Sequence, residues 1–216
     1  MTIVITGANR GIGHALHQLY KADGADVIGT RRDATDAPGW LTLDVRDPAQ
    51  HQAMAESLAD RHVSLLICNA GIYPDKGEKL DDGYDAALWA DGFSTNVTGV
   101  FLTIQALLPN LRRNKAKVAI ISSQMGSTTR APGGSYIYRA SKAAVLNLGR
   151  NLATDLTTDG IAVGVYHPGW VQTDMGGSTA EITVNEAAQG LKSRFDALSI
   201  ETTGCFETWD GRPHAY

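Results

Sequence analysis

A tyrosine and a lysine four residues apart are the side chains of this chain best placed for acid–base chemistry. Tyr138 and Lys142 open a segment whose apolar residues recur at spacings of three and four, which predicts a helix. Residues four apart share one helix face. A free phenol, with a pKa of about 10, is a poor base at neutral pH, but a nearby ammonium favours the phenolate. Such a pair could pass a proton to or from a substrate oxygen.

Neighbouring residues sharpen this hypothesis without settling it. A predicted strand ends at Ser122-Ser123, just upstream, and could deliver a hydroxyl to the same place. Tyr136 serves as an internal comparison, because the residue four positions later is Ala140, so Tyr138 is the better candidate. A tyrosine and a lysine at this spacing also occur on ordinary surface helices, and the spacing alone fits that alternative too.

A glycine-rich loop near the start could hold a dinucleotide. Ile3 to Ile5 read as a buried strand, and residues 6–13, Thr-Gly-Ala-Asn-Arg-Gly-Ile-Gly, follow before an amphipathic helix. Glycines there let backbone N–H groups approach a pyrophosphate, which the helix N-terminus also attracts. The spacing is G-x-x-x-G-x-G, and ordinary strand-to-helix turns also contain glycine, so the loop alone leaves both interpretations open.

The end of the second predicted strand, residues 26–30, bears on the choice of cofactor. An acid at this place accepts hydrogen bonds from the ribose 2′-OH, whereas arginine can bind a 2′-phosphate. The strand ends at Arg31-Arg32, and Arg10 lies in the glycine loop. These arginines favour NADP(H) over NAD(H), with a solvated turn as the alternative.

The rest of the chain continues to alternate between strands and helices. The pattern predicts a strand over residues 40–45 with Asp44 at its end, a helix over 48–61, and a strand over 64–68 followed by Asn69-Ala70-Gly71. It then predicts a rim loop over 73–83 and a helix over about 92–112. The remaining elements are a strand over 161–166 followed by the turn 167–173, a helix from the capping box at Thr183 to about Leu198, and a last strand over 204–207. Asn96 lies among apolar neighbours on the long helix. A buried amide there is either a satisfied core group or a site residue.

This alternation predicts an α/β fold, a Rossmann-type doubly wound parallel sheet of about seven strands with helices on both faces. Ligands of such sheets bind beyond the carboxyl ends of the strands, where Gly7, Asn69, Ser123 and Pro168 all fall.

Composition excludes several other classes of protein. The 216 residues are 43% hydrophobic and no linker divides them, so we expect a single domain over 1–216. A net charge of −4 argues against binding of nucleic acid, and no apolar run approaches the roughly 20 residues of a membrane span. Two cysteines, Cys68 and Cys205, form no disulfide framework, so we expect a cytoplasmic protein. The six histidines show no metal-ligand spacing, and no metal is predicted.

Taken in order, the motifs resemble those of the classical short-chain dehydrogenase/reductase family. The matching residues are the loop 6–13, Asp44, Asn69-Ala70-Gly71, Asn96, Ser123, Tyr138 to Lys142 and Pro168-Gly169. The resemblance spans almost the whole chain. It implies a cofactor half over about 1–115 and a catalytic and substrate half over about 116–216.

The resemblance also implies roles for individual residues. Tyr138 matches the acid/base, Ser123 the catalytic serine, Lys142 the residue that lowers the tyrosine pKa and binds the nicotinamide ribose, and Asn96 the holder of a proton-relay water. Asp44 matches the acid that reads the adenine, and Thr173 the residue that binds the carboxamide. The full set of predicted cofactor contacts is Gly7, Asn9, Arg10, Gly11, Ile12, Gly13, Arg31, Arg32, Asp44, Val45, Asn69, Ala70, Gly71, Tyr138, Lys142, Pro168, Gly169, Val171 and Thr173.

The segment Tyr138 to Lys142, the turn over 168–177 and the ending Trp209-Asp210-Gly211 resemble the small carbonyl-reductase-like branch that includes C-signal and sniffer-type proteins. That similarity implies an NADPH-dependent carbonyl reductase, reversible as an alcohol dehydrogenase, that acts on ketones, aldehydes or secondary alcohols as a homodimer. The alternative it implies is a regulatory protein of C-signal type that binds dinucleotide with little turnover. One departure is that Ser123 and Tyr138 are 15 residues apart, two more than in many members, so the loop between them takes its own path.

The sequence indicates the substrate-binding residues less clearly than the cofactor-binding ones. Six residues are candidates for its lining, and each could equally pack against the sheet or the loop after Pro168: Tyr73, Gln124, Met125, Tyr136, Trp170 and Met175.

Overall fold

A single parallel sheet organises the computed structural model, which describes residues 1–216. Its strands are β1 (Thr2–Ile5), β2 (Asp26–Arg31), β3 (Trp40–Thr42), β4 (Val63–Cys68), β5 (Lys117–Ile121), β6 (Ala162–His167) and β7 (Phe206–Thr208). They lie in the order β3-β2-β1-β4-β5-β6-β7, and every neighbouring pair is parallel. The order reverses between β1 and β4, which confirms the predicted doubly wound α/β fold.

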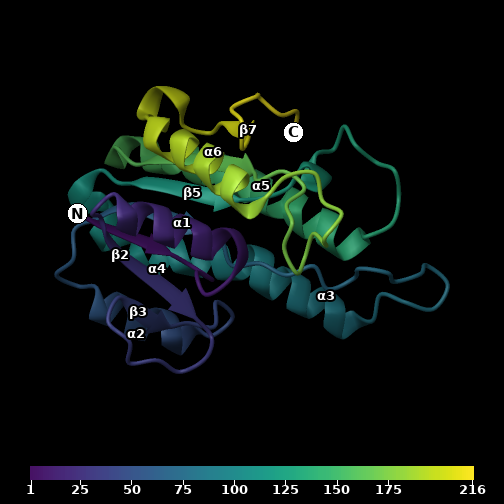
Figure 1. Ribbon diagram of the computed structural model, residues 1–216, viewed down its shortest axis with the longest axis horizontal. Coiled ribbons are helices and arrows are strands. Elements are labelled where there is room, and N and C mark those ends of the chain that lie inside the picture. The colour runs from purple at the N-terminus through teal and green to yellow at the C-terminus, as the bar shows by residue number, and fades with distance from the viewer.

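Helices cover both faces of this sheet (Figure 1). Helices α1 (Gly11–Ala22) and α6 (Val184–Ala197) pack together on one face, and α2 (Pro48–Ser57), α4 (Gly99–Asn114) and α5 (Tyr136–Leu156) cover the other. Side chains alternate between the two cores: Ile3 and Ile5 face α1 and α6, whereas Val4 faces α4. No helix is both long and apolar enough to cross a membrane.

Two elements, β3 and α2, end earlier than predicted. Strand β3 stops at Thr42, because the Asp44 backbone N–H turns to the Gln50 side chain at 2.6 Å instead of continuing the ladder. Helix α2 ends at Ser57 and not at Arg61. The amide of Asn110, on α4, binds the carbonyls of Leu58 and Arg61, so those carbonyls are satisfied without further helix.

The predicted helix over about 92–112 forms, but it begins earlier, at Ala86, and contains a π-helical turn. It consists of α3 (Ala86–Phe93), the turn η1 (Ser94–Thr98) and α4, with helical backbone at both junctions. Gly99 packs against Val45, where a Cβ would meet Val45 atoms at 2.8 Å, so the helix must pass this point closely. Such π-turns occur mostly at functional sites, and this one carries Asn96.

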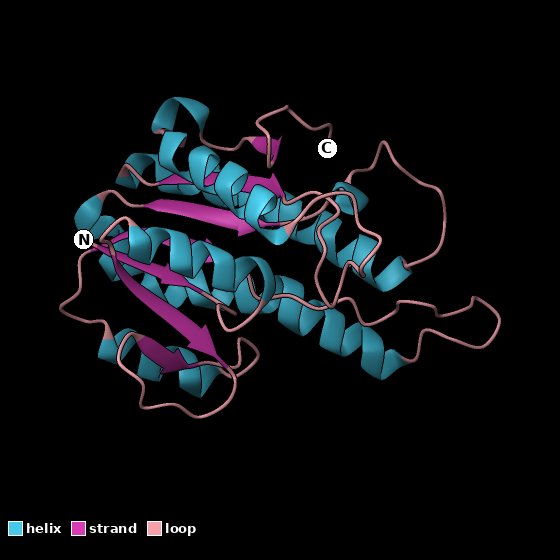
Figure 2. Ribbon diagram, in the orientation of Figure 1, coloured by secondary structure: helices cyan, strands magenta, loops and turns pink.

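Helix α5 begins at Tyr136, two residues before the predicted start. Ser135 precedes it with a left-handed φ of 51° and offers no side-chain cap. The short 3-10 helix η2 (Gln124–Gly126) follows Ser123 and packs against α5. The last strand, β7, lies two residues later than predicted. The longest loops, 69–85, 127–135 and 168–183, project beyond the carboxyl ends of the strands, where Figure 2 shows them together.

Candidate active site

Tyr138, Ser123 and Lys142 meet at the carboxyl ends of β5 and β6. Tyr138 is buried, and the nearby Ser123 hydroxyl is among the groups that affect the pKa of its phenol. The Ser123 Oγ accepts from the Met125 backbone N–H at 3.1 Å, which fixes its position. The Lys142 Nζ lies 5.7 Å from the centroid of the Tyr138 ring and donates to the Ile121 carbonyl at 2.9 Å. The structure therefore brings together the three side chains that the sequence singled out.

Burial governs the protonation of this group. It raises the pKa of Tyr138 to about 12, and the Ser123 hydroxyl opposes this rise. Burial also lowers the pKa of Lys142 to about 8. Burial thus dominates the pKa of Tyr138, and a lowering of that pKa by Lys142 stays a prediction. The phenol is protonated at neutral pH, which is the form that donates a proton.

Two residues of the loop after β4, Tyr73 and Asp75, contact Tyr138. The Tyr73 ring stacks on the Tyr138 ring with centroids 4.3 Å apart, and its hydroxyl hydrogen-bonds Ser135. Asp75 is only 1% exposed, and its carboxylate accepts from the backbone N–H groups of Ile137 at 2.8 Å and Tyr138 at 3.1 Å. A carboxylate thus replaces the missing N-cap of α5. Sequence reasoning missed Asp75, because an acid in a polar loop gives no sign of being buried.

Asn96 joins the same loop to α5. Its Oδ1 accepts from the Ile72 N–H, and its Nδ2 donates to the Ile72 carbonyl and the Ser141 hydroxyl, each at 2.9 Å. Asn96 is therefore a satisfied buried amide, and its role as a site residue stays a prediction. A water bound by this residue stays a prediction.

A cleft of about 820 Å³ leads from the glycine loop to Tyr138 and Lys142. Of the predicted cofactor contacts, Gly13, Gly169 and Val171 are not in its lining. Those that line it are Gly7, Asn9, Arg10, Gly11, Ile12, Arg31, Arg32, Asp44, Val45, Asn69, Ala70, Gly71, Tyr138, Lys142, Pro168 and Thr173.

The glycine loop is shaped for a phosphate group. Gly7 and Gly11 have φ values of 63° and 55°, which glycine adopts without strain. No side chain caps the N-terminus of α1, so its first N–H groups are free for an anion. Gly13 instead allows close packing, because a Cβ there would lie 2.4 Å from the Asn69 Nδ2. Asn69 in turn donates to the Thr6 and Gly7 carbonyls at 3.0 Å, so it braces the loop.

The end of β2 fits a further anionic group. The Nε of Arg31 is buried with no hydrogen-bond partner, although its terminal nitrogen pairs with Asp33 at 3.1 Å. Arg32 lines the cleft without a carboxylate partner. Arg10 pairs with Asp174 at 3.0 Å, but both side chains are well exposed, so this pair contributes little. The residues present therefore fit a dinucleotide with a 2′-phosphate.

Asp44 has a partner that sequence reasoning missed. Arg46 binds both of its carboxylate oxygens, with Nη2 2.7 Å from Oδ2 and Nε 3.0 Å from Oδ1. The side-chain hydrogen bonds from Arg46 are the main reason that the pKa of Asp44 falls to about 2. Arg46 also pairs with Asp91 at 3.1 Å. An adenine would thus meet the Asp44–Arg46 pair and not a free carboxylate.

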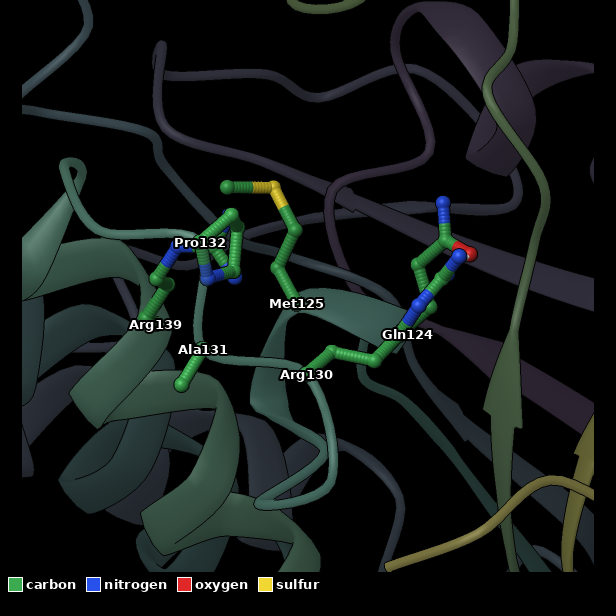
Figure 3. Close-up of a pocket in the computed structure, with 6 residues that line it drawn as sticks. All are labelled: Gln124, Met125, Arg130, Ala131, Pro132 and Arg139. Atoms are coloured by element: carbon green, nitrogen blue, oxygen red, sulfur yellow. Dashed lines mark hydrogen bonds between the residues drawn. The ribbon is translucent and has the colours of Figure 1, made fainter.

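The six candidate substrate residues separate into three groups. Tyr73 and Met175 line the cleft, and the Met175 carbonyl accepts from Lys76 at 3.1 Å. Gln124 and Met125 line a second pocket beside the first (Figure 3).

Tyr136 and Trp170 line neither cavity. Tyr136 is exposed and packs edge-on against Tyr84, with ring centroids 5.0 Å apart. The Trp170 Nε1 donates to the Gly176 carbonyl at 2.9 Å, and its side chain is also exposed. That these two line a substrate site stays a prediction.

Comparison with known proteins agrees with this geometry. Residues 1–183 match the family described as short chain dehydrogenase. The 1-hydroxy-2-glutathionyl-2-methyl-3-butene dehydrogenase of Rhodococcus sp. (strain AD45) is 34% identical over 97% of each chain. C-signal of Myxococcus xanthus is 37% identical over 74% of this chain and 96% of its own. The NADPH-bound carbonyl reductase from chicken fatty liver has a TM-score of 0.91 and 31% identity, covering 100% of this chain and 98% of that one. The chain thus belongs to the short-chain dehydrogenase/reductase family of oxidoreductases.

Proposed function

We propose that this protein is an NADPH-dependent carbonyl reductase that reduces a ketone or aldehyde to an alcohol, and that the reaction is reversible. The observation that carries the proposal is the placement of buried Tyr138 near Ser123, with the Lys142 Nζ 5.7 Å from the centroid of the Tyr138 ring, at the end of a cleft that fits a dinucleotide. The similarity to an NADPH-bound carbonyl reductase supports it.

The roles of the side chains follow from their protonation and contacts. NADPH, when bound, supplies the hydride for the carbonyl carbon. The Ser123 hydroxyl donates a hydrogen bond to the carbonyl oxygen and stabilises its developing charge. Tyr138, protonated at neutral pH, gives its proton to that oxygen, and solvent then restores it. The charge of Lys142 stabilises the phenolate left behind.

A comparison of two tyrosine variants tests this assignment. We expect purified protein to oxidise NADPH in the presence of some member of a panel of ketones and aldehydes. Tyr138→Phe should lose at least about 100-fold in kcat while NADPH still binds, because it removes the proton and little volume. Tyr136→Phe is the matched control and should keep its activity, since that tyrosine is exposed. Equal activity in Tyr138→Phe, or a collapse in Tyr136→Phe, would overturn the assignment.

The cofactor preference rests on Arg31, Arg32 and Arg10. If their charges hold a 2′-phosphate, NADPH should bind more tightly than NADH, and high salt should shrink the difference because exposed charges are screened. Arg31→Asp should reverse the preference, since a carboxylate repels a phosphate but accepts hydrogen bonds from a ribose. Fluorescence titration with both cofactors measures this. Equal affinities in the unaltered protein would refute the proposal.

The similarity to C-signal supports a second candidate function, that of a dinucleotide-binding regulatory protein with little turnover. The complete set of Ser123, Tyr138 and Lys142 favours the enzyme, because a binding role needs no buried proton donor. Tight NADPH binding without oxidation across the carbonyl panel would favour the regulatory role.

A further inference from the structure

The second pocket, which we name the arginine pocket, lies beside Ser123. Figure 3 shows its lining, Gln124, Met125, Arg130, Ala131, Pro132 and Arg139, around a volume of about 430 Å³. Small-molecule sites span roughly 300–1,000 Å³. Met125, in the lining, donates its backbone N–H to the Ser123 hydroxyl at 3.1 Å, so the pocket adjoins Ser123.

The charge of this lining is positive and unbalanced. It contains two arginines and no acidic residue, and neither arginine forms an ion pair. The Nε of half-buried Arg139 donates to the Gly134 carbonyl at 3.1 Å, which leaves its two terminal nitrogens without a partner. Arg130 bonds to the Gln124 side chain. In Figure 3, Arg139 and Pro132 lie on one side, Arg130 and Gln124 on the other, and Met125 between them.

The charge of Arg130 lies near enough to the end of β6 to affect His167. Burial is the main cause that lowers the pKa of His167 to about 4, and the nearby charges of His214 and Arg130 lower it further. His167 is the last residue of β6 and directly precedes Pro168. Arg130 and Pro132 belong to the loop after Ser123 that is two residues longer than in many members of the family. Half of the lining, Arg130, Ala131 and Pro132, therefore comes from the segment in which this chain departs from the family's pattern.

We propose that the arginine pocket binds a carboxylate carried by the carbonyl substrate, so that the preferred substrates are keto acids or aldehyde acids. A guanidinium group matches the two oxygens of a carboxylate, and Arg139 has the free nitrogens for this. Met125 and Pro132 offer apolar contact to the methylene groups between the acid and the carbonyl. This proposal rests on the carbonyl reductase function proposed above.

Pairs of substrates that differ only in charge test the proposal. The unaltered protein is assayed with NADPH and with 4-oxopentanoate, 5-oxohexanoate and 6-oxoheptanoate, each beside its methyl ester. We expect at least one acid to exceed its ester in kcat/KM by about tenfold or more, because hydrogen bonds to charged groups are strong. In the double variant Arg130→Gln, Arg139→Gln the ratio should fall to about one. Arg113→Gln is the matched control, because Arg113 donates only to the Ala59 carbonyl on the surface, and should keep the ratio.

Two further measurements keep the result decisive. Calorimetric titration with hexanoate, which has no carbonyl to reduce, should show binding to the protein with NADP⁺ and none to the double variant. If Arg139→Gln impairs folding, Arg130→Gln alone can be used instead, because Arg130 lies on an exposed loop. This single variant should give an acid-to-ester ratio between that of the unaltered protein and one. Hexanoate binding without turnover of any carbonyl would support the pocket while the reductase proposal fails. Acid-to-ester ratios near one in the unaltered protein, or an unchanged ratio in the double variant, would overturn the pocket.

Discussion

The buried carboxylate of Asp75 links the rim of the cleft to the reactive tyrosine. It forms no ion pair, and two backbone N–H groups at the start of α5 stabilise it instead. Hydrogen bonds from amides and the positive end of a helix offset the cost of burying such a charge. Because one of the amides belongs to Tyr138, the position of the phenol depends on this contact.

Substitution of Asp75 should therefore affect both stability and rate. Asp75→Ala leaves two buried N–H groups without acceptors and should cost about 1–3 kcal/mol in the free energy of unfolding. We expect kcat to fall by about tenfold with little change in KM, because a displaced tyrosine impairs the transition state more than binding. Asp75→Asn, which keeps one acceptor, should restore part of both. Urea denaturation and steady-state kinetics measure the two effects.

Asp47→Ala is the control for this prediction. Asp47 caps α2 by accepting from the Ala49 N–H at 2.9 Å, and it does not line the cleft. The substitution should lower the free energy of unfolding by about 1 kcal/mol and leave kcat unchanged. Loss of kcat in Asp47→Ala to the same extent as in Asp75→Ala would show that the effect is general and not positional.

At the scale of single residues, the sequence predicted side chains that belong to motifs and missed those that act through folded contacts. Tyr138, Lys142 and Ser123 stand out because their types and spacing suit one reaction. Asp75 and Arg46 do not, since their roles depend on which backbone amides or carboxylates the fold brings to them. Desolvation, likewise a property of the fold, dominates the pKa of Tyr138.

At the scale of elements, the packing of η2 on α5 sets the approach of Ser123 to Tyr138. The Ser122 hydroxyl donates to the Lys142 carbonyl at 2.9 Å, which ties the end of β5 to α5. Gly126 lies so close to the same turn that an added Cβ would be 2.5 Å from the Lys142 carbonyl carbon. Ser122 before Ser123 and Gly126 after it thus fix Ser123 against α5.

Gly126→Ala should push η2 away from α5. We expect a loss of about 1–3 kcal/mol in stability, because backbone atoms of a packed helix cannot yield easily. We also expect a fall in kcat, since Ser123 moves with η2. Thermal unfolding and kinetics measure these effects. Gly133→Ala is the control: its φ of 84° makes alanine strained by about 1 kcal/mol, yet no atom lies within 4 Å. A fully active Gly126→Ala would contradict this account of the packing.

The elements themselves were predictable where local periodicity decides them. Runs such as residues 64–68 and the helix around Tyr138 carry their own patterns, and the seven strands form in the predicted order along the chain. The predicted bounds are wrong where a side chain distant in sequence hydrogen-bonds backbone groups or where close packing changes the course of a helix. Asn110 ends α2 early, and Asn96 marks a π-turn that no propensity indicates.

At the scale of the whole molecule, the outer surfaces of α4 and α5 carry apolar side chains that the sheet does not cover completely. Phe101 on α4 is 39% exposed, while Leu148 and Leu152 on α5 are half-buried. Both helices cover the same face of the sheet. A two-fold axis would bury them against their own copies.

We therefore predict a homodimer, as the family resemblance implies. Light scattering at micromolar concentration should give a mass near that of two chains of 23.0 kDa. Phe101→Glu should yield a monomer, because a charge buried in an apolar interface has no partner there. Leu80→Glu is the control, since Leu80 is 73% exposed on the rim loop, away from α4 and α5, and the variant should stay dimeric. A monomeric unaltered protein would contradict the prediction, and the exposed faces would then belong to the monomer's own surface.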